Sequence, residues 1–84
     1  MTYVNARIME VKTVFNRNLF RAKLAERGIT AERVAGMIGV NPATLSRKMS
    51  GESDFTRLEI QNLRRILCLT PEELELIFFA QELT

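Results

Sequence analysis

The chain has 84 residues, 46% of them hydrophobic, so we expect one compact domain without a separate catalytic or effector domain. No stretch approaches the roughly 20 apolar residues of a membrane span, and the early charges Arg7, Glu10 and Lys12 do not fit a signal peptide, so we expect a cytoplasmic protein with no membrane partner. Cys68 is the only cysteine and histidine is absent, which excludes an internal disulfide and argues against zinc.

The net charge of +2 conceals an uneven distribution. Residues 1–68 contain all twelve Lys and Arg and six of the ten Asp and Glu, a net +6, and residues 69–84 carry −4. A basic body suits a phosphate-binding surface, but an ordinary solvated surface explains the same distribution equally well. Charge alone therefore does not decide the function.

Residues 1–16 fit neither a helical nor a strand period. Their apolar residues, from Tyr3 to Phe15, are compatible with an added helix, with a strand or arm used in dimerisation, or with a partly disordered extension. We therefore treat residues 1–16 as an N-terminal extension and place the domain at residues 17–84.

The first helix is predicted over residues 17–27. Asn16 or Asn18 can begin it, Phe20 and Leu24 share one of its faces, and Gly28 can adopt the left-handed conformation that often ends a helix.

A helix-start pattern then recurs four times: an apolar residue, a Thr or Asn, three further residues and a second apolar residue. The Thr or Asn oxygen can cap the first turn, and the two apolar side chains can close over it. Glu59 and Glu73 add capping boxes, and Pro42 and Pro71 occupy first helical positions. The caps are Thr30, Asn41, Thr56 and Thr70, and they predict helices over residues 31–38, 42–50, 57–67 and 71–81.

Helical spacing assigns the core, with methionines and phenylalanines as packing residues rather than ligands. The expected core residues are Val34, Ala35, Ile38, Leu45, Met49, Leu58, Ile60, Leu63, Ile66, Leu67, Leu74, Ile77 and Phe78.

Four residues between the second and third predicted helices meet the steric requirements of a helix-turn-helix. Ala35 is small where two helices cross closely, and Gly39 permits the positive φ of a tight turn. Val40 can pack this turn into the core, and Leu45 can anchor the next helix. The spacing predicts a helix-turn-helix at the second and third helices.

Residues 19–69 also resemble the small DNA-binding domains of phage repressors and Cro proteins, the xenobiotic-response-element-like helix-turn-helix family. The matching segments are ERGIT, VAGMIGVNPATLSRKMSG and LRRIL, and the C-terminal run FTRLEIQNLRRILCLTPEELELIFF resembles short phage-encoded regulators. The resemblance implies an all-α, lambda-repressor-like fold of about five short helices. One departure is Lys48, where many relatives have an aliphatic residue; Met49 is expected to provide the packing instead.

The outward side of the 42–50 helix carries the residues expected to touch bases. With Leu45 and Met49 facing inward, the outward residues are Ala43, Thr44, Arg47 and Lys48. Similar proteins read bases with the N-terminal half of this helix in the major groove. The Arg47 fork fits guanine O6 and N7, and Ala43 or Thr44 can contact a thymine methyl group.

Phosphate contacts are expected around this helix. Asn41 is predicted first as a cap and second as a phosphate ligand. The other candidates are Thr30, Ser46, Ser50, Arg21, Lys23 and Arg57, and the three basic residues are also explained as solvated charges.

These features predict a transcriptional regulator, a phage or prophage Cro- or repressor-like protein that acts by occupying a double-stranded DNA operator. A homodimer is expected because two half-sites increase affinity, and the alternative is a monomer with weak, cooperative assembly on DNA. No small-molecule ligand, cofactor or enzymatic activity is expected, since no catalytic constellation is present and helix dipoles explain the acids of residues 72–75. The alternative is a protein-interaction module, such as an antitoxin or adaptor, that uses the last helix, which is apolar on more than one face.

Overall fold

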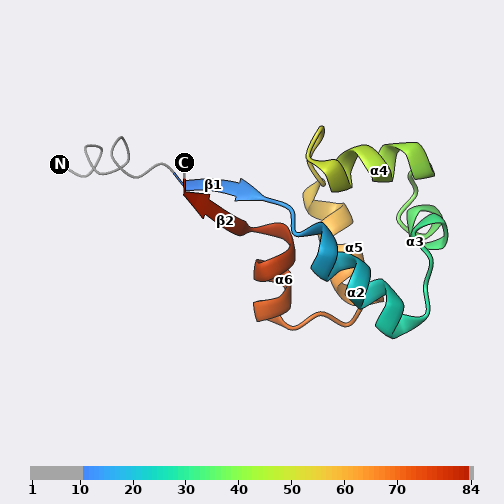
Figure 1. Cartoon of the computed structure of the whole chain (residues 1–84). Helices are drawn as coiled ribbons and strands as arrows, with labels where there is room; N and C mark the ends of the chain where they lie inside the picture. The colour runs from blue at the N-terminus through green and yellow to red at the C-terminus, as the bar shows by residue number, and fades with distance from the viewer. Residues whose placement is uncertain (1–10, 84) are drawn as a thin grey trace.

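The computed structural model describes residues 11–83, which form five helices and one two-stranded antiparallel sheet (Figure 1). In chain order the elements are β1 (Val11–Val14), α2 (Arg17–Arg27), α3 (Ala31–Met37), α4 (Pro42–Ser50), α5 (Arg57–Ile66), α6 (Pro71–Phe78) and β2 (Ala80–Leu83). The expectation of a small, mostly helical fold is confirmed, and the sheet is an addition to it. No helix among these residues is long and apolar enough to cross a membrane.

The helix starts lie where the caps predict them. The side chains of Asn16, Thr30, Asn41, Thr56 and Thr70 each accept a hydrogen bond from the backbone N–H three residues later. Both predicted capping boxes form, at Thr56 with Glu59 and at Thr70 with Glu73. Gly28 ends α2 with φ of 65°. These local hydrogen bonds satisfy first-turn donors that a helix cannot pair internally.

The last helix is shorter than predicted. It ends at Phe78 instead of residue 81, because Ala80–Leu83 pairs with Val11–Val14. In the antiparallel register Val11 lies opposite Leu83 and Val14 opposite Ala80. Of the alternatives open for residues 11–14, the structure therefore selects a strand, while residues 1–10 of the extension lie outside the described residues. Figure 1 shows the sheet projecting from the helical part beside α6.

All five helices contribute to a single core. Its buried hydrophobic residues are Phe20, Leu24, Val34, Ala35, Leu45, Met49, Leu63, Leu67, Leu69, Ile77 and Phe78. Four phenylalanines, Phe15, Phe20, Phe55 and Phe78, lie in mutual contact, with ring centroids 4.9–6.5 Å apart. The prediction for Leu58 is wrong, because it is 65% exposed, whereas Leu63 of α5 and Leu67 just after this helix are buried.

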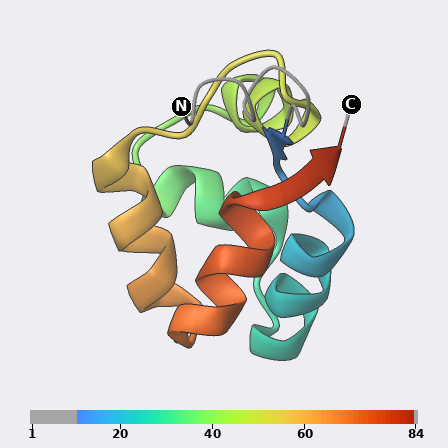
Figure 2. The same cartoon turned by 90° about the vertical axis from the view of Figure 1, so that its left-hand side faces the viewer.

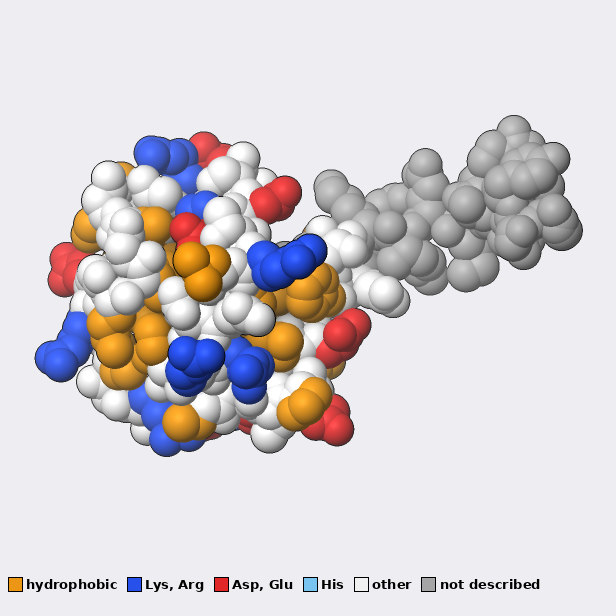
Figure 3. All heavy atoms as spheres, turned by 180° about the vertical axis from the view of Figure 1, so that it is seen from behind, with side chains coloured by type: hydrophobic (Ala, Val, Ile, Leu, Met, Phe, Trp, Pro, Cys, Tyr) orange, Lys and Arg blue, Asp and Glu red, His pale blue; other side chains and the backbone are white. Residues whose placement is uncertain are grey.

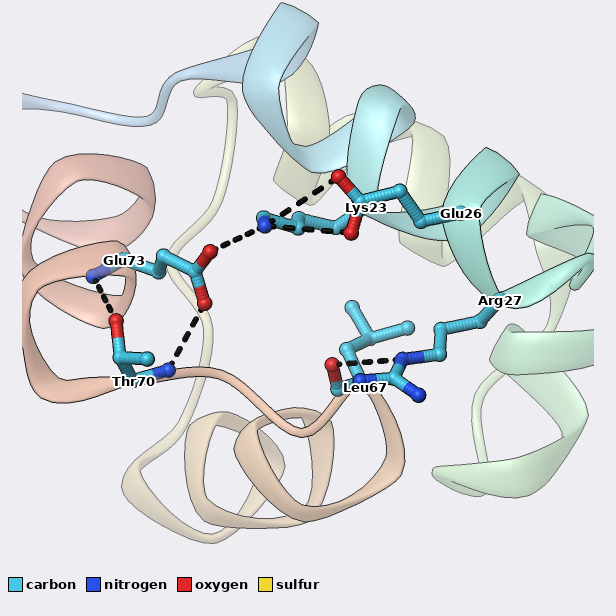
Figure 4. A network of polar contacts seen from close by, with 6 residues as sticks. All are labelled: Lys23, Glu26, Arg27, Leu67, Thr70 and Glu73. Carbon is cyan, nitrogen blue, oxygen red and sulfur yellow. Dashed lines mark hydrogen bonds and ion pairs between the residues drawn. The ribbon is translucent and has the colours of Figure 1, made fainter.

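A polar network joins α2 to the start of α6 (Figure 4). The Lys23 ammonium pairs with the carboxylates of Glu73 and Glu26, and Arg27 Nε donates to the Leu67 carbonyl at 3.2 Å. The hydrogen bond between Lys23 and Glu73 raises the pKa of Lys23, and it also holds the pKa of Glu73 below its usual value. The network thus fixes α2 against the connection between α5 and α6.

Candidate nucleic-acid interface

A tight turn joins α3 to α4. Gly39 has φ of 81°, a conformation that glycine adopts without steric cost. The Val40 N–H donates to the Ala35 carbonyl at 3.0 Å, and the Val40 side chain packs against the core. Ala35 is fully buried on α3, which packs against α4, and Leu45 is buried on the facing side of α4. The residues at the four predicted turn and packing positions therefore have the expected conformations and burial.

The exposed side of α4 presents three of the four residues predicted to touch bases. Ala43 and Arg47 are exposed and Thr44 is half-buried, whereas Leu45 and Met49 point into the core. The Arg47 guanidinium lies 3.4 Å from Thr44 Oγ1, so these two side chains share one patch. Figure 2 shows α4 lying across one end of the molecule, with α5, α6 and α2 beneath it. The exposed patch residues are therefore on the side of α4 away from Leu45 and Met49, at one end of the fold.

Lys48 does not belong to this patch, and the prediction that it faces outward is wrong. Lys48 is only 9% exposed. Its ammonium donates to the Asp54 carbonyl at 2.8 Å and lies 3.1 Å from Glu59 Oε1. It also lies 5.9 Å from the centre of the Phe55 ring. Because the loop after α4 and the first turn of α5 supply these partners, the ammonium is held inside the protein.

The predicted phosphate ligands near α4 are exposed, and several also have structural roles. Asn41 Oδ1 accepts from the Thr44 N–H at 2.7 Å, and Thr30 Oγ1 accepts from the Arg33 N–H, which confirms both as caps. Ser50 Oγ donates to the Arg47 carbonyl at 3.0 Å, so it helps to close the end of α4. The capping atoms of these residues are occupied, while the side chains themselves remain accessible.

Arg21 and Ser46 come together in a shallow depression of about 160 Å³ where α2, the start of α3 and α4 meet. Arg17 lies in the same depression and was missed by the sequence reasoning. Its position four residues before Arg21 on one helix was the signal that could have identified it. Glu32 also lines this depression, so the positive charge there is partly offset.

The remaining two basic candidates lie away from this depression. Lys23 is wrong as a free phosphate ligand, because its ammonium is committed to Glu73 and Glu26. Arg57 is exposed in the first turn of α5, just after the loop that follows α4. On the face seen in Figure 3, Lys and Arg side chains occupy several separate positions with hydrophobic groups between them. Positive charge is therefore spread over the molecule and not confined to α4.

A larger open groove of about 620 Å³ lies between β1, the loop after α4 and the end of α6. Phe15, Phe55 and Phe79 supply apolar walls, and Lys48 is also among the lining residues. In the part of the chain that the structure describes, no three His, Cys, Asp or Glu residues gather as metal ligands. Thr13, Ser50, Ser53 and Asp54 line the groove beside these phenylalanines, so its lining is mixed polar and apolar.

Comparison of the chain with protein-family models, with curated protein sequences and with solved structures gives no match.

Proposed function

We propose that this protein is a sequence-specific double-stranded DNA-binding regulator in which α3 and α4 form a helix-turn-helix. The observation that carries the proposal is the two-sided character of α4. Leu45 and Met49 anchor it to the core, and the opposite side presents Ala43, Thr44 and Arg47 at one end of the fold. A helix presented in this way can enter the major groove, which is wide enough to admit it.

Within this proposal Arg47 reads a base and the surrounding polar groups fix the protein on the phosphate backbone. The Arg47 fork can donate two hydrogen bonds to guanine O6 and N7. Backbone contacts come from Arg17 and Arg21 in the depression beside α4 and from Arg57 at the start of α5. The polar groups in the same role are Thr30, Asn41, Ser46 and Ser50. Such contacts position a protein without specifying sequence.

The resemblance of residues 19–69 to phage repressors and Cro proteins supports regulation by operator occupancy. A protein that blocks a promoter needs no catalytic group and no cofactor, so we propose a non-enzymatic cytoplasmic regulator. We also propose that it acts as a homodimer, because two-fold operators are matched by two-fold proteins.

Selection from random-sequence duplex DNA tests the proposal. Wild-type protein is expected to enrich a common sequence. Arg47→Ala is expected to weaken binding to that sequence by about 1–3 kcal/mol and to relax preference at one base pair. Arg65→Ala is the matched control, because this arginine is also exposed but lies in the last turn of α5, at the opposite end of that helix from Arg57. Recovery of no common sequence contradicts DNA reading, and a uniform loss on all sequences contradicts the assignment of Arg47.

A second candidate function is protein interaction through α6, favoured by two exposed apolar residues. Leu76 is 55% exposed and Phe79 is 43% exposed, one turn apart. Large apolar side chains in such positions are typical of contact surfaces when they adjoin one another. Sedimentation of wild type and of Leu76→Ser/Phe79→Ser tests this surface. Loss of self-association assigns the surface to the homodimer. Unchanged sedimentation together with absence of DNA binding favours a partner protein.

A further inference from the structure

The buried ammonium of Lys48 connects the last turn of α4 to the element that follows it. Lys48 Nζ donates to the Asp54 carbonyl in the loop at 2.8 Å and lies 3.1 Å from the Glu59 carboxylate on α5. Both side chains of the ion pair are nearly buried, with 10% and 13% of their surface exposed. One side chain of α4 thus contacts both the connecting loop and the next helix.

Glu59 is itself held in place, so it provides a fixed partner for Lys48. Its Oε1 accepts from the Thr56 N–H at 2.9 Å, and its own N–H donates to Thr56 Oγ1 at 3.1 Å. Burial raises the pKa of Glu59, but the hydrogen bonds from Thr56 and Lys48 outweigh burial and hold the pKa below its usual value. The carboxylate is therefore charged at neutral pH and fixed by the capping box of α5.

The apolar anchors of α4 do not by themselves fix the position of its last turn. Leu45 and Met49 determine which side of the helix faces the core, but hydrophobic contacts are not directional. The bonds of Lys48 to Asp54 and Glu59 are directional, and they hold the turn that also contains Arg47. A displacement of this turn therefore displaces the Arg47 guanidinium.

We infer that Lys48 is a positioning residue for DNA reading: its ion pair with Glu59 sets the placement of the last turn of α4, and hence of Arg47, in the major groove. The inference rests on the proposed function. A buried ion pair contributes little net stability compared with an apolar pair of similar size, and fixing one arrangement is its best-attested role. Lys48 thus contributes to sequence discrimination without touching DNA.

The test uses Lys48→Met/Glu59→Gln, which removes one charge of each sign and leaves the net charge unchanged. Met preserves length and apolar volume, and Gln keeps an acceptor for the Thr56 N–H. The control is Arg64→Met/Glu75→Gln, which makes the same charge change at two exposed residues. Each protein is measured by titration against the selected duplex and against a scrambled duplex of equal length. The titrations are repeated at several salt concentrations, with thermal unfolding in parallel.

The double variant is expected to lose at least tenfold in the ratio of specific to non-specific affinity. Its thermal midpoint is expected to stay within about 5 °C of wild type. The slope of affinity against salt should not change, because the number of phosphates contacted is the same. The control is expected to keep the wild-type ratio.

Three outcomes overturn the inference. An unchanged ratio in the folded double variant shows that Lys48 does not position the reading side chain. Equal weakening on both duplexes with a shallower salt slope shows that Lys48 contacts phosphate directly. Absence of any preferred sequence for wild type overturns the proposed function itself, and the inference with it.

Lys48→Met alone keeps the test decisive if the double variant does not fold. This change removes the buried ammonium, while the Glu59 carboxylate keeps the Thr56 N–H as a donor in the first turn of α5, where negative charge is favoured. A threefold or greater fall in the affinity ratio then supports the inference. A wild-type ratio in this variant contradicts it.

Discussion

Replacement of Ala35 by leucine tests the close packing of α3 against α4. Ala35 is fully buried, and its carbonyl accepts the Val40 N–H that closes the turn before α4. Leucine adds three carbon atoms at a position with no solvent-exposed surface. Since the backbone of the turn is bonded to this residue, we expect the added atoms to be accommodated by displacement of α4.

The expected cost follows from the behaviour of overpacked cores. Extra methylene groups in a well-packed interior cost about 1–3 kcal/mol. A loss of ~2 kcal/mol lowers the thermal midpoint of a domain of this size by roughly 8–16 °C. Circular dichroism at 222 nm during heating and urea titration measures the loss. DNA binding by the folded fraction should also weaken, because α4 carries the proposed reading residues.

The adjacent Gly36 supplies a matched control. It is exposed in the same helix, and a methyl group added to it would meet no heavy atom within 4 Å. Gly36→Ala is therefore expected to stabilise the protein by about 0.5–1 kcal/mol through helix propensity. Wild-type stability in Ala35→Leu would refute the close crossing of α3 and α4. Destabilisation of Gly36→Ala would show that this face of α3 is not open.

Three further predictions concern stability. Cys68 has φ of 52°, which is strained for a residue with a side chain, so Cys68→Gly should raise the free energy of unfolding by roughly 0.5–1 kcal/mol in urea titration. A Cys68→Ser variant with the same gain would show that strain is not the cause. The raised pKa of Lys23 means that its stabilisation is present below pH 10.5 and is lost as the pH rises through the folded-state pKa. The lowered pKa of Glu73 means that its stabilisation is present above pH 4.5 and is lost as the pH falls through the folded-state pKa. Unfolding midpoints across pH should lose part of both dependences in Lys23→Met/Glu73→Gln, and wild-type profiles in this variant would contradict the pairing. Leu63→Ala should cost about 2–5 kcal/mol because this side chain is fully buried, and a cost below 1 kcal/mol would show that the core relaxes around it.

Features of the fold that depend on neighbouring residues were predictable from the sequence. A cap needs only one polar side chain and the N–H three residues later, so Thr30, Asn41, Thr56 and Thr70 marked their helices correctly. The tight turn at Gly39 was predictable in the same way, because a backbone with positive φ favours glycine whatever lies elsewhere in the chain.

Features that depend on residues distant in the sequence were not predictable. Val11–Val14 forms a strand because Ala80–Leu83 lies beside it, and a short apolar run does not reveal its partner. Lys48 has an outward position when only Leu45 and Met49 are considered. Its side chain is buried because the ammonium binds the Asp54 carbonyl and the Glu59 carboxylate, and the helical spacing of α4 does not show where these two groups lie. The prediction for Leu58 failed for the same reason. Helical spacing alone does not show that this residue, at the start of α5, lies outside the buried side of the helix.

The pairing of β1 with β2 has a consequence for the order of folding. Val11 and Leu83 are partners from opposite ends of the described chain, whereas each helix is closed by hydrogen bonds within a single turn. Long-range contacts form only after the entropy of closing a long loop has been lost, and local helical contacts form much earlier. We therefore expect the individual helices to form before the strands meet. We also expect separation of the strands to leave the helices formed, because the pairing of β1 with β2 is separate from the hydrogen bonds that close each helix.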